Sequence, residues 1–179
     1  NAVFDTDKLD WMNAQYVARM SVEELAAHAR TVLEEAGLTG SPIVHDTLRF
    51  HRLLVLLRPR VKRLGDFVEQ GRPLLAPAVE YDPAAIEKNF TSGDMAEHLA
   101  ALAQALERLS PFDESHVETV VRGTATDRSI KAGPLIHAVR VALTGRTASP
   151  GLFEMMALLG REETTARLRA LLAFLAARS

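Results

Sequence analysis

The amino-acid sequence predicts an all-α fold, arranged as two consecutive helical bundles. Apolar residues recur at helical spacing along most of the 179 residues, and strand-like alternation never extends beyond a few residues. Near the middle, residues 71–83 include three prolines and no helical period, which is typical of a boundary. We therefore expect helical subdomains at residues 21–80 and 81–179, preceded by a short segment, residues 1–20.

The first two helices are predicted at residues 7–18 and 21–37. The first has an apolar face, formed by Leu9, Met12 and Tyr16. Ser21 and Glu24 are spaced as a capping box, in which each side chain accepts a hydrogen bond from the backbone N–H of the other residue. This pair predicts where the second helix begins.

A third predicted helix, residues 41–59, opens with a Ser–Pro pair, because proline at the first helical position loses no hydrogen bond. We expect Pro59 to end this helix and to force Arg58 out of the helical conformation. Arg60 then begins a new element at a corner of the chain. A short basic helix, residues 61–70, is expected to follow.

The second half of the chain predicts five helices, over residues 93–109, 115–125, 134–144, 150–159 and 162–177. Ser115 and Glu118 are spaced as a second capping box. Gly145 is expected to end the helix that carries Arg140. Ser149 and Pro150 are expected to open the next one, whose first N–H groups would face the gap between the two helices.

Composition excludes several classes of protein. A hydrophobic fraction of 47% with 25% charged residues is typical of a globular chain. No apolar run approaches the roughly 20 residues that a membrane span needs, and the N-terminus has no signal-peptide pattern. The absence of cysteine excludes disulfides and fits a cytoplasmic location. The chain begins without Met, from which we expect that it was cut from a longer protein.

Motifs for catalysis or cofactor binding are missing from the sequence. The six histidines form no HExxH pair and have no acid at ligand spacing, so no metal site is predicted. Glycine-rich phosphate loops and the GxSxG motif are absent as well. Two pairs of adjacent glutamates diverge around their helices and do not face each other. We therefore expect no catalytic residue and no cofactor in this chain.

Positive charge is concentrated in two segments, although the net charge is -2. Residues 47–65 contain six Lys or Arg and no acid, and residues 120–153 contain five against a single Asp. Together the two segments carry +10, so the rest of the chain carries -12. Local positive potential of this kind permits binding to a polyanion.

The first basic segment contains a candidate reader of RNA. An arginine at a corner, here Arg60, can present its guanidinium to guanine O6 and N7, or to O2 and N3 of an unstacked cytosine. Proteins read RNA sequence mainly in single-stranded loops, where base edges are exposed. The alternative is a solvated basic face. Weaker contacts to phosphates are expected from Arg58, Lys62, Arg63 and, in the second segment, Arg146.

The second candidate site lies around the loop after Gly145. Arg140 precedes this loop, and Ser149, which can donate or accept hydrogen bonds, follows it. Pro150 and Leu152 are expected to offer an apolar surface beside the exposed N–H groups near Gly151. An ordinary helix cap is the alternative role for Ser149.

Three segments resemble bacterial-type glutamyl-tRNA synthetase, a class I family. They are residues 4–13 (FDTDKLDWMN), 57–60 (LRPR) and 139–168, and the similarity extends from residue 4 to about residue 172. The resemblance implies a helical anticodon-binding region, with residues 1–20 as the tail of a stem-contacting domain. It also implies tRNA(Glu) as the partner. We expect a monomer that binds neither DNA nor membranes.

The resemblance also implies roles for single residues. The family arginine that matches Arg60 reads the third anticodon letter, a cytosine, and members with glutamine there accept both glutamate and glutamine tRNAs. Arg60 therefore implies a discriminating reader. Arg140 and Arg122 match arginines that contact the anticodon. The loop that contacts the first two letters matches Ser149, Pro150, Gly151 and Leu152.

The chain departs from the family pattern in three ways. It has Ala138 where many members have proline, and Arg146 makes the loop more basic. The HIGH-type and KMSKS-type motifs of the catalytic half are absent, so ATP, Mg and glutamate are expected to bind in a part outside this sequence. The parent would be a glutamate–tRNA ligase, and this chain alone would not be catalytic. The alternative is a stand-alone helical paralogue that serves as a protein-interaction or general RNA-binding module.

Overall fold

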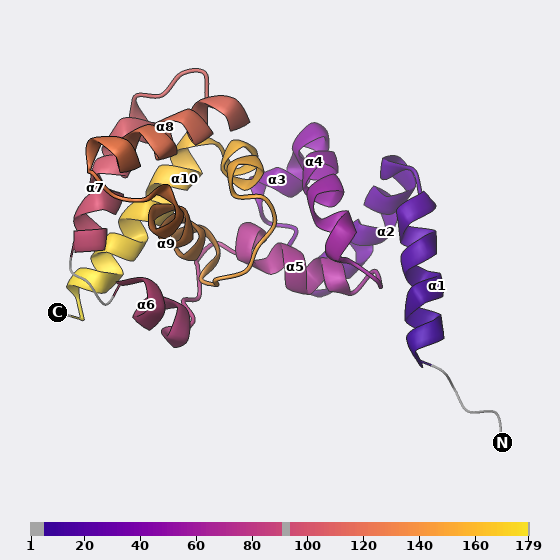
Figure 1. Cartoon of the computed structure of the whole chain (residues 1–179). Coiled ribbons are helices and arrows are strands. Elements are labelled where there is room, and N and C mark those ends of the chain that lie inside the picture. Colours follow the sequence, from indigo (N-terminus) through magenta and orange to yellow (C-terminus); the bar gives the residue numbers. More distant parts are fainter. Residues whose placement is uncertain (1–5, 91–93, 179) are drawn as a thin grey trace. The chain divides into compact units, whose positions relative to one another are not determined.

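The structure, a computed structural model, describes residues 6–90 and 94–178. These residues form ten α-helices and one 3-10 helix and include no strand, which confirms the predicted all-α class. The chain divides into two compact units, Asn1–Pro77 and Ala78–Ser179 (Figure 1). This division falls close to the predicted boundary at residue 80. The separate assignment of residues 1–20 to a stem-contacting domain stays a prediction.

The first unit is built on three helices that pack against one another. Its elements are α1 (Thr6–Arg19), α2 (Val22–Glu35), α3 (Pro42–His45), α4 (Thr47–Leu57), the 3-10 helix η1 (Arg58–Arg60) and α5 (Asp66–Leu75). Helices α2, α4 and α5 contact one another and bury Leu25, Leu33, Phe50, Leu53, Leu57 and Phe67. The capping box at the start of α2 is confirmed, because Glu24 N–H donates to Ser21 Oγ and Ser21 N–H donates to Glu24 Oε2.

The predicted single helix over residues 41–59 is wrong. The chain leaves the helical conformation at Asp46 (φ -93°, ψ 111°), which separates α3 from α4. The Asp46 carboxylate accepts the Arg49 N–H at 3.0 Å and thereby caps a new helix. A capping side chain in the middle of an apolar period therefore divides it into two helices.

The predicted helix over residues 61–70 is also wrong, because α5 begins only at Asp66. Val61 is extended, and the Asp66 carboxylate accepts the backbone N–H groups of Lys62 and Arg63 at 2.7 and 2.9 Å. The helix then continues past Gly71 and through Pro73. Its last residues, Leu74 and Leu75, are buried, and their burial offsets the hydrogen bond that Pro73 cannot make.

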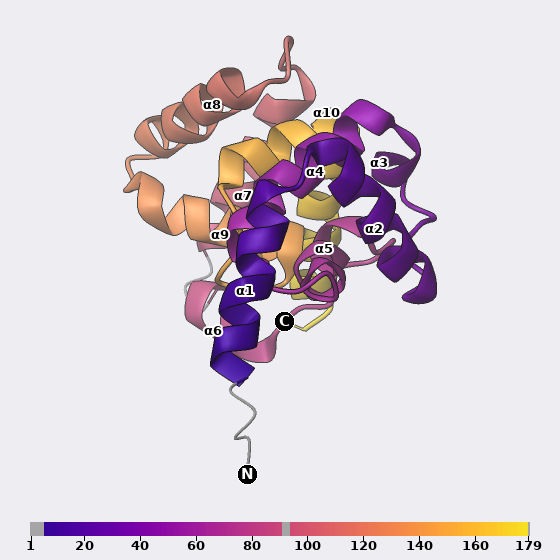
Figure 2. The same cartoon turned by 90° about the vertical axis from the view of Figure 1, so that its right-hand side faces the viewer.

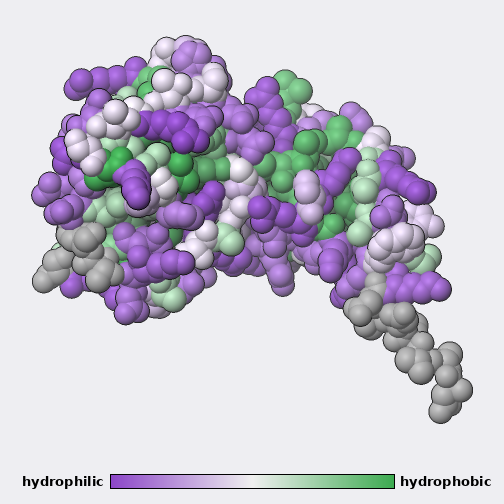
Figure 3. Space-filling view, in the orientation of Figure 1, coloured by the Kyte–Doolittle hydropathy of each residue, from purple (hydrophilic) through white to green (hydrophobic). Residues whose placement is uncertain are grey.

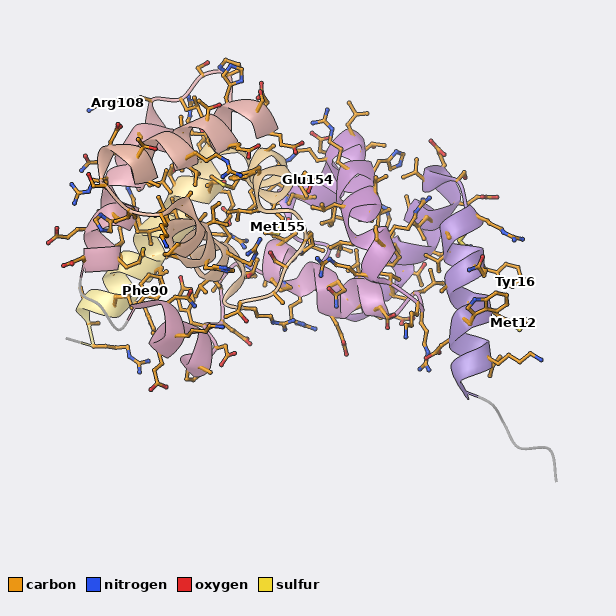
Figure 4. The ribbon with its side chains drawn as sticks, viewed as in Figure 1. Met12, Tyr16, Phe90, Arg108, Glu154 and Met155 are labelled. Atoms are coloured by element: carbon orange, nitrogen blue, oxygen red, sulfur yellow. The ribbon has the colours of Figure 1, made fainter. Side chains whose placement is uncertain are left out.

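The predicted apolar face of α1 is largely exposed. The exposed fractions of Met12 and Tyr16 are 40% and 65%, and Trp11, on the same helix, is 64% exposed. Figure 4 shows Met12 and Tyr16 on the outer side of α1. The first two residues of the motif at residues 4–13 lie outside the described part of the chain.

In the second unit, four helices pack around a shared core. Its elements are α6 (Pro83–Phe90), α7 (Asp94–Glu107), α8 (Glu114–Asp127), α9 (Ala132–Thr144) and α10 (Leu152–Ala176). Helix α10 contacts α7, α8 and α9 (Figures 1 and 2). The core includes Leu99, Leu102, Leu106, Val121, Leu135, Leu143 and Leu168. Helix α6 was not predicted, and the predicted start of α7 at Gly93 lies outside the described residues.

In the second unit, the structure tests the predicted cap of α8 and the predicted division of α10. The predicted capping box of Ser115 and Glu118 is wrong, because Asp113 caps α8 and accepts the His116 N–H at 3.0 Å. Gly160 has non-helical dihedral angles (φ 81°, ψ 170°) and divides α10 into two segments, close to the two helices that were predicted.

The surface of the described residues is largely polar, with apolar surface over α4, where Leu48 and Val55 are exposed (Figure 3). No helix in the described ranges is long and apolar enough to cross a membrane.

Candidate nucleic-acid interface

The second half of the first basic segment, residues 58–65, follows α4 as a tight turn. Arg58 keeps helical dihedral angles (φ -45°, ψ -44°), so the prediction that Pro59 forces it out of that conformation is wrong. The residue before a proline is disfavoured in the helical region but not excluded from it. Arg58 N–H still donates to Leu54 O, and Arg58 O accepts the Val61 N–H at 3.2 Å. Pro59 lies in the first turn of η1, where its missing N–H removes no bond.

The four cations of this turn differ in how the protein uses them. Arg60 and Lys62 are exposed, and among the described residues the Arg60 side chain has no hydrogen-bond or ion-pair partner. Arg63 instead forms an ion pair with Asp10 of α1. The hydrogen bond from Arg63 lowers the pKa of the Asp10 carboxyl and raises the pKa of Arg63. Arg63 therefore stabilises the unit and is less available to a ligand than Arg60.

Arg58 is partly buried. Its Nε and Nη2 atoms are inaccessible and find no hydrogen-bond acceptor within the part of the chain that the structure describes. Arg58 is therefore less available for the expected phosphate contact than Arg60. Of the four cations of this turn, Arg60, Lys62 and Arg63 are exposed, and Arg63 is held by Asp10.

The second basic segment surrounds the end of α9. Gly145 ends this helix in the left-handed conformation (φ 71°), as predicted, and its N–H donates to Val141 O at 2.8 Å. A Cβ atom at Gly145 would lie 1.8 Å from Glu80 O, so only glycine fits here. Gly145 O accepts the Asp82 N–H at 2.9 Å, which ties the end of α9 to the chain before α6.

A buried arginine also holds the end of α9. Arg167 of α10 is 5% exposed, and its Nη1 donates to Leu143 O at 2.8 Å. Its Nε donates to Glu163 Oε1 at 2.6 Å. Thr144 Oγ1 donates back to Arg140 O at 2.8 Å. These bonds fix the point at which the basic loop leaves the helix.

Arg140 and Ser149 meet across this loop. Arg140 Nε donates to Ser149 Oγ at 2.8 Å, and Arg140 Nη1 lies 3.4 Å from His137 Nδ1. Ser149 Oγ also donates to Pro150 O at 2.9 Å. Ser149 does not cap a helix, because α10 begins at Leu152 with Gly151 as its cap residue. The prediction that residues 149 and 150 open the helix is therefore wrong, and the serine instead holds the arginine.

The start of α10 is less open than predicted. Pro150 and Leu152 are buried, so they form no exposed apolar surface in this structure. A Cβ atom at Gly151 would lie 1.5 Å from Glu154 Oε2, so the Glu154 carboxylate lies against the helix end. An acid in the first turn is attracted to the positive end of the helix dipole. The exposed N–H groups expected near Gly151 are thus already next to an anion.

Arg122 belongs to the same unit and contacts a residue that the sequence reasoning missed. Its Nε donates to Glu118 Oε1 at 2.7 Å, and its guanidinium carbon lies 5.8 Å from the centroid of the Phe153 ring. Phe153 is the second residue of α10 and is partly exposed. The signal in the sequence was an aromatic residue directly after the predicted residues 149–152.

The structure thus groups the predicted residues in two sets. Arg58, Arg60, Lys62 and Arg63 lie in the first unit, and Arg122, Arg140, Arg146, Ser149, Pro150, Gly151 and Leu152 lie in the second. Arg146 is exposed on the loop after α9. No group of three or more potential metal ligands occurs among residues 6–90 and 94–178.

Comparisons with known proteins give one consistent family. Residues 14–172 match the family model described as an anticodon binding domain. The chain is 37% identical over 169 residues to glutamate–tRNA ligase 2 of Koribacter versatilis, with 94% of this chain and 35% of that protein covered. It is 38% identical over 168 residues to glutamate–tRNA ligase 2 of Rubrobacter xylanophilus, with 93% and 34% covered. The chain spans about a third of the length of these curated relatives.

The fold is also found in solved structures. A crystal structure of a glutamate tRNA ligase from Elizabethkingia meningosepticum, in complex with its amino acid, superposes with a TM-score of 0.85 at 22% identity. The match covers 96% of this chain and 33% of that chain. A glutamate-tRNA synthetase from Elizabethkingia anophelis gives a TM-score of 0.80 at the same identity.

Proposed function

The chain belongs to the anticodon-binding domain family, and from this membership we propose that it recognises the anticodon of glutamate tRNA. The matched range, residues 14–172, includes both basic segments. The observation that carries the proposal is the state of Arg60, which is exposed at the end of a 3-10 turn and has no side-chain partner among the described residues.

Arg60 is suited to read one base. Its backbone position is defined by the 3-10 helix on one side and by the extended Val61 on the other. A guanidinium that forms no bond with its own protein can donate in parallel to two acceptors of a cytosine, O2 and N3. We assign Arg60 to the third anticodon letter. In the family that the chain resembles, members with glutamine at this position accept both tRNAs, so we assign Arg60 to a discriminating reader.

Arg140 and Ser149 are suited to the remaining anticodon letters. Their mutual hydrogen bond fixes the guanidinium direction before RNA arrives, which lowers the entropy lost on binding. Gly151 is exposed with the Glu154 carboxylate against it, whereas Pro150 and Leu152 are buried and support the loop from inside. Lys62 and Arg146 are exposed cations for the phosphate backbone. Arg58 and Arg63 would add weaker phosphate contacts, because Arg58 is partly buried and Arg63 forms an ion pair with Asp10.

The full ligase would attach glutamate to its tRNA. ATP, Mg and glutamate would bind in the remaining two thirds of the relatives' length, and this chain would hold the anticodon end of the tRNA. The location would be the cytoplasm, where tRNA is charged.

A second candidate function has one specific observation in its favour. Trp11 and Tyr16 of α1 are 64% and 65% exposed, although large apolar side chains are usually buried or engaged by a partner. A protein-interaction module would contact its partner through exposed apolar side chains of this kind. It would bind a protein partner and show no salt-dependent binding to tRNA.

Binding to tRNA at two salt concentrations tests the proposal. Glutamate tRNA should bind more tightly at the lower salt concentration, since each phosphate contact releases counterions. A glutamate tRNA whose third anticodon letter is changed from C to G should bind about 5- to 150-fold more weakly at both concentrations. Binding that ignores the third letter would leave a general RNA-binding module, and no binding at low salt would favour the interaction module.

A further inference from the structure

We propose that Asp10 of α1 positions Arg60 through Arg63, an inference that rests on the proposed function and deepens it. Asp10 and Arg63 form an ion pair, in which Arg63 Nε donates to Asp10 Oδ1. The two residues are 53 positions apart in the sequence, whereas Arg63 and Arg60 belong to the same turn. Helix α1 also contacts the 3-10 helix η1, which ends at Arg60.

The direction of the Arg60 guanidinium depends on the backbone of this turn. Within residues 6–90 and 94–178 its side chain has no hydrogen-bond or ion-pair partner that would orient it. The backbone beside it is held by the bond from Val61 N–H to Arg58 O, and Val61 is buried. A group that recognises a ligand must be held within about 0.5 Å of its productive position. A shift of the turn would therefore change how Arg60 meets a base.

Two carboxylates hold the turn beyond Val61, one close in the sequence and one distant. Asp66 accepts the backbone N–H groups of Lys62 and Arg63 at 2.7 and 2.9 Å. These bonds close the turn upon itself. Asp10 instead holds the Arg63 side chain and attaches the turn to a neighbouring helix. Without the Asp10 charge, the turn keeps its internal bonds but loses this attachment.

Asp10 is suited to hold Arg63. Its side chain is 23% exposed, against 57% for Arg63, so most of the carboxylate is covered by protein. The hydrogen bond from Arg63, together with the charges of Arg63 and Lys62, lowers the pKa of Asp10. The carboxylate is therefore ionised at neutral pH and offsets the positive charge of Arg63.

The ion pair also separates a base-reading cation from a general one. A free Arg63 would be an exposed cation that contacts the phosphates of any RNA, and such contacts add affinity without sequence preference. Removal of the Asp10 charge should therefore have two separable effects. A loosened turn lowers the preference of Arg60 for cytosine, and a freed Arg63 raises the affinity for RNA of either sequence.

Binding of Asp10→Asn to glutamate anticodon stem-loops with C or G as the third letter tests this role. The substitution keeps the size of the side chain and removes the charge that holds Arg63. The preference for C should fall about 5-fold, the lower end of the effect of one well-read base, and affinity for the G stem-loop should not fall. Loss of one surface ion pair changes stability only slightly, so thermal unfolding followed by circular dichroism should show a retained fold.

Further variants assign the effect to the ion pair. Arg63→Gln should lower the preference for C to the same extent, and its combination with Asp10→Asn should lower it no further. Asp10→Glu keeps the carboxylate and should restore most of the preference. Glu107→Gln is the matched control, because it removes one acid from an ion pair with Arg169 in the second unit, where the side chains are 34% and 66% exposed. It should leave the preference for C unchanged.

The outcomes separate this inference from the function on which it rests. A lower preference for C in Asp10→Asn, shared by Arg63→Gln and absent from Glu107→Gln, supports the positioning role. An unchanged preference, or an equal loss of affinity for both RNAs, overturns that role and leaves anticodon binding by Arg60 intact. If the unaltered chain does not prefer C, the proposed function and the positioning role are both overturned.

Discussion

Replacement of Gly145 by alanine should destabilise the second unit by about 2–3 kcal/mol. Gly145 has φ 71°, where a Cβ atom costs about 1–2 kcal/mol. That atom would lie 1.8 Å from Glu80 O, a backbone atom that cannot move alone. Relief of this clash would break the 2.9 Å hydrogen bond from Asp82 N–H to Gly145 O, which adds about 1 kcal/mol.

Urea denaturation followed by circular dichroism measures this loss. Gly133→Ala is the matched control, because a Cβ atom at Gly133 meets nothing within 4 Å and alanine favours a helix. The control should be as stable as the original chain or slightly more stable. A loss below about 1 kcal/mol for Gly145→Ala would refute the reasoning, since the left-handed conformation alone costs that much.

Three further predictions concern groups that hold the two basic segments and α8. Arg167→Met should lower the free energy of unfolding by about 1–3 kcal/mol, measured by urea denaturation, because Leu143 O would lose its buried donor. The pKa of Asp113 is lowered from 3.8 to about 2 by hydrogen bonds at the start of α8, so stability should fall as pH drops from 4 towards 2. Thermal unfolding of Asp113→Asn should show less of this dependence. Asp66→Ala removes the acceptor of two loop N–H groups and should raise amide hydrogen exchange at Lys62 and Arg63.

The elements that could be predicted are those whose ends are determined by residues close together in the sequence. Ser21 and Glu24 bond to each other across one turn, so the sequence contains both partners of the capping box. Glycine readily adopts the left-handed conformation that ends a helix, so a glycine directly after an apolar period predicts the end of α9 from the local sequence alone. Gly160 is a local signal of the same kind, and it divides the apolar helical pattern of α10 into two segments.

The wrong predictions arose where two local signals competed or where burial decided. Asp113 and Ser115 can both cap a helix, and the structure selects the aspartate, whose carboxylate also bonds the His116 side chain at 2.7 Å. Proline at position 73 signalled a break, but burial of Leu74 and Leu75 continues the helix.

For the candidate site, the sequence indicates which residues are candidates better than it indicates which side chains contact one another. Arg60 as an exposed corner residue follows from the sequence, whereas the bond of Arg63 to Asp10 joins residues 53 positions apart. The contact of Arg122 with Phe153 joins two helices in the same way. Such pairings depend on packing, and no local pattern indicates them.

The central claim is that Arg60 reads the third anticodon letter, and a comparison of two arginine variants tests it directly. Arg60→Gln and Arg52→Gln each remove one exposed cation of the same basic segment. Binding is measured to glutamate anticodon stem-loops with C or G as the third letter. Arg60→Gln should lose most of the preference for C, about 5- to 150-fold in the original chain, whereas Arg52→Gln should keep it. An equal loss of affinity for both RNAs on Arg60→Gln would contradict the claim, because that result marks a phosphate contact.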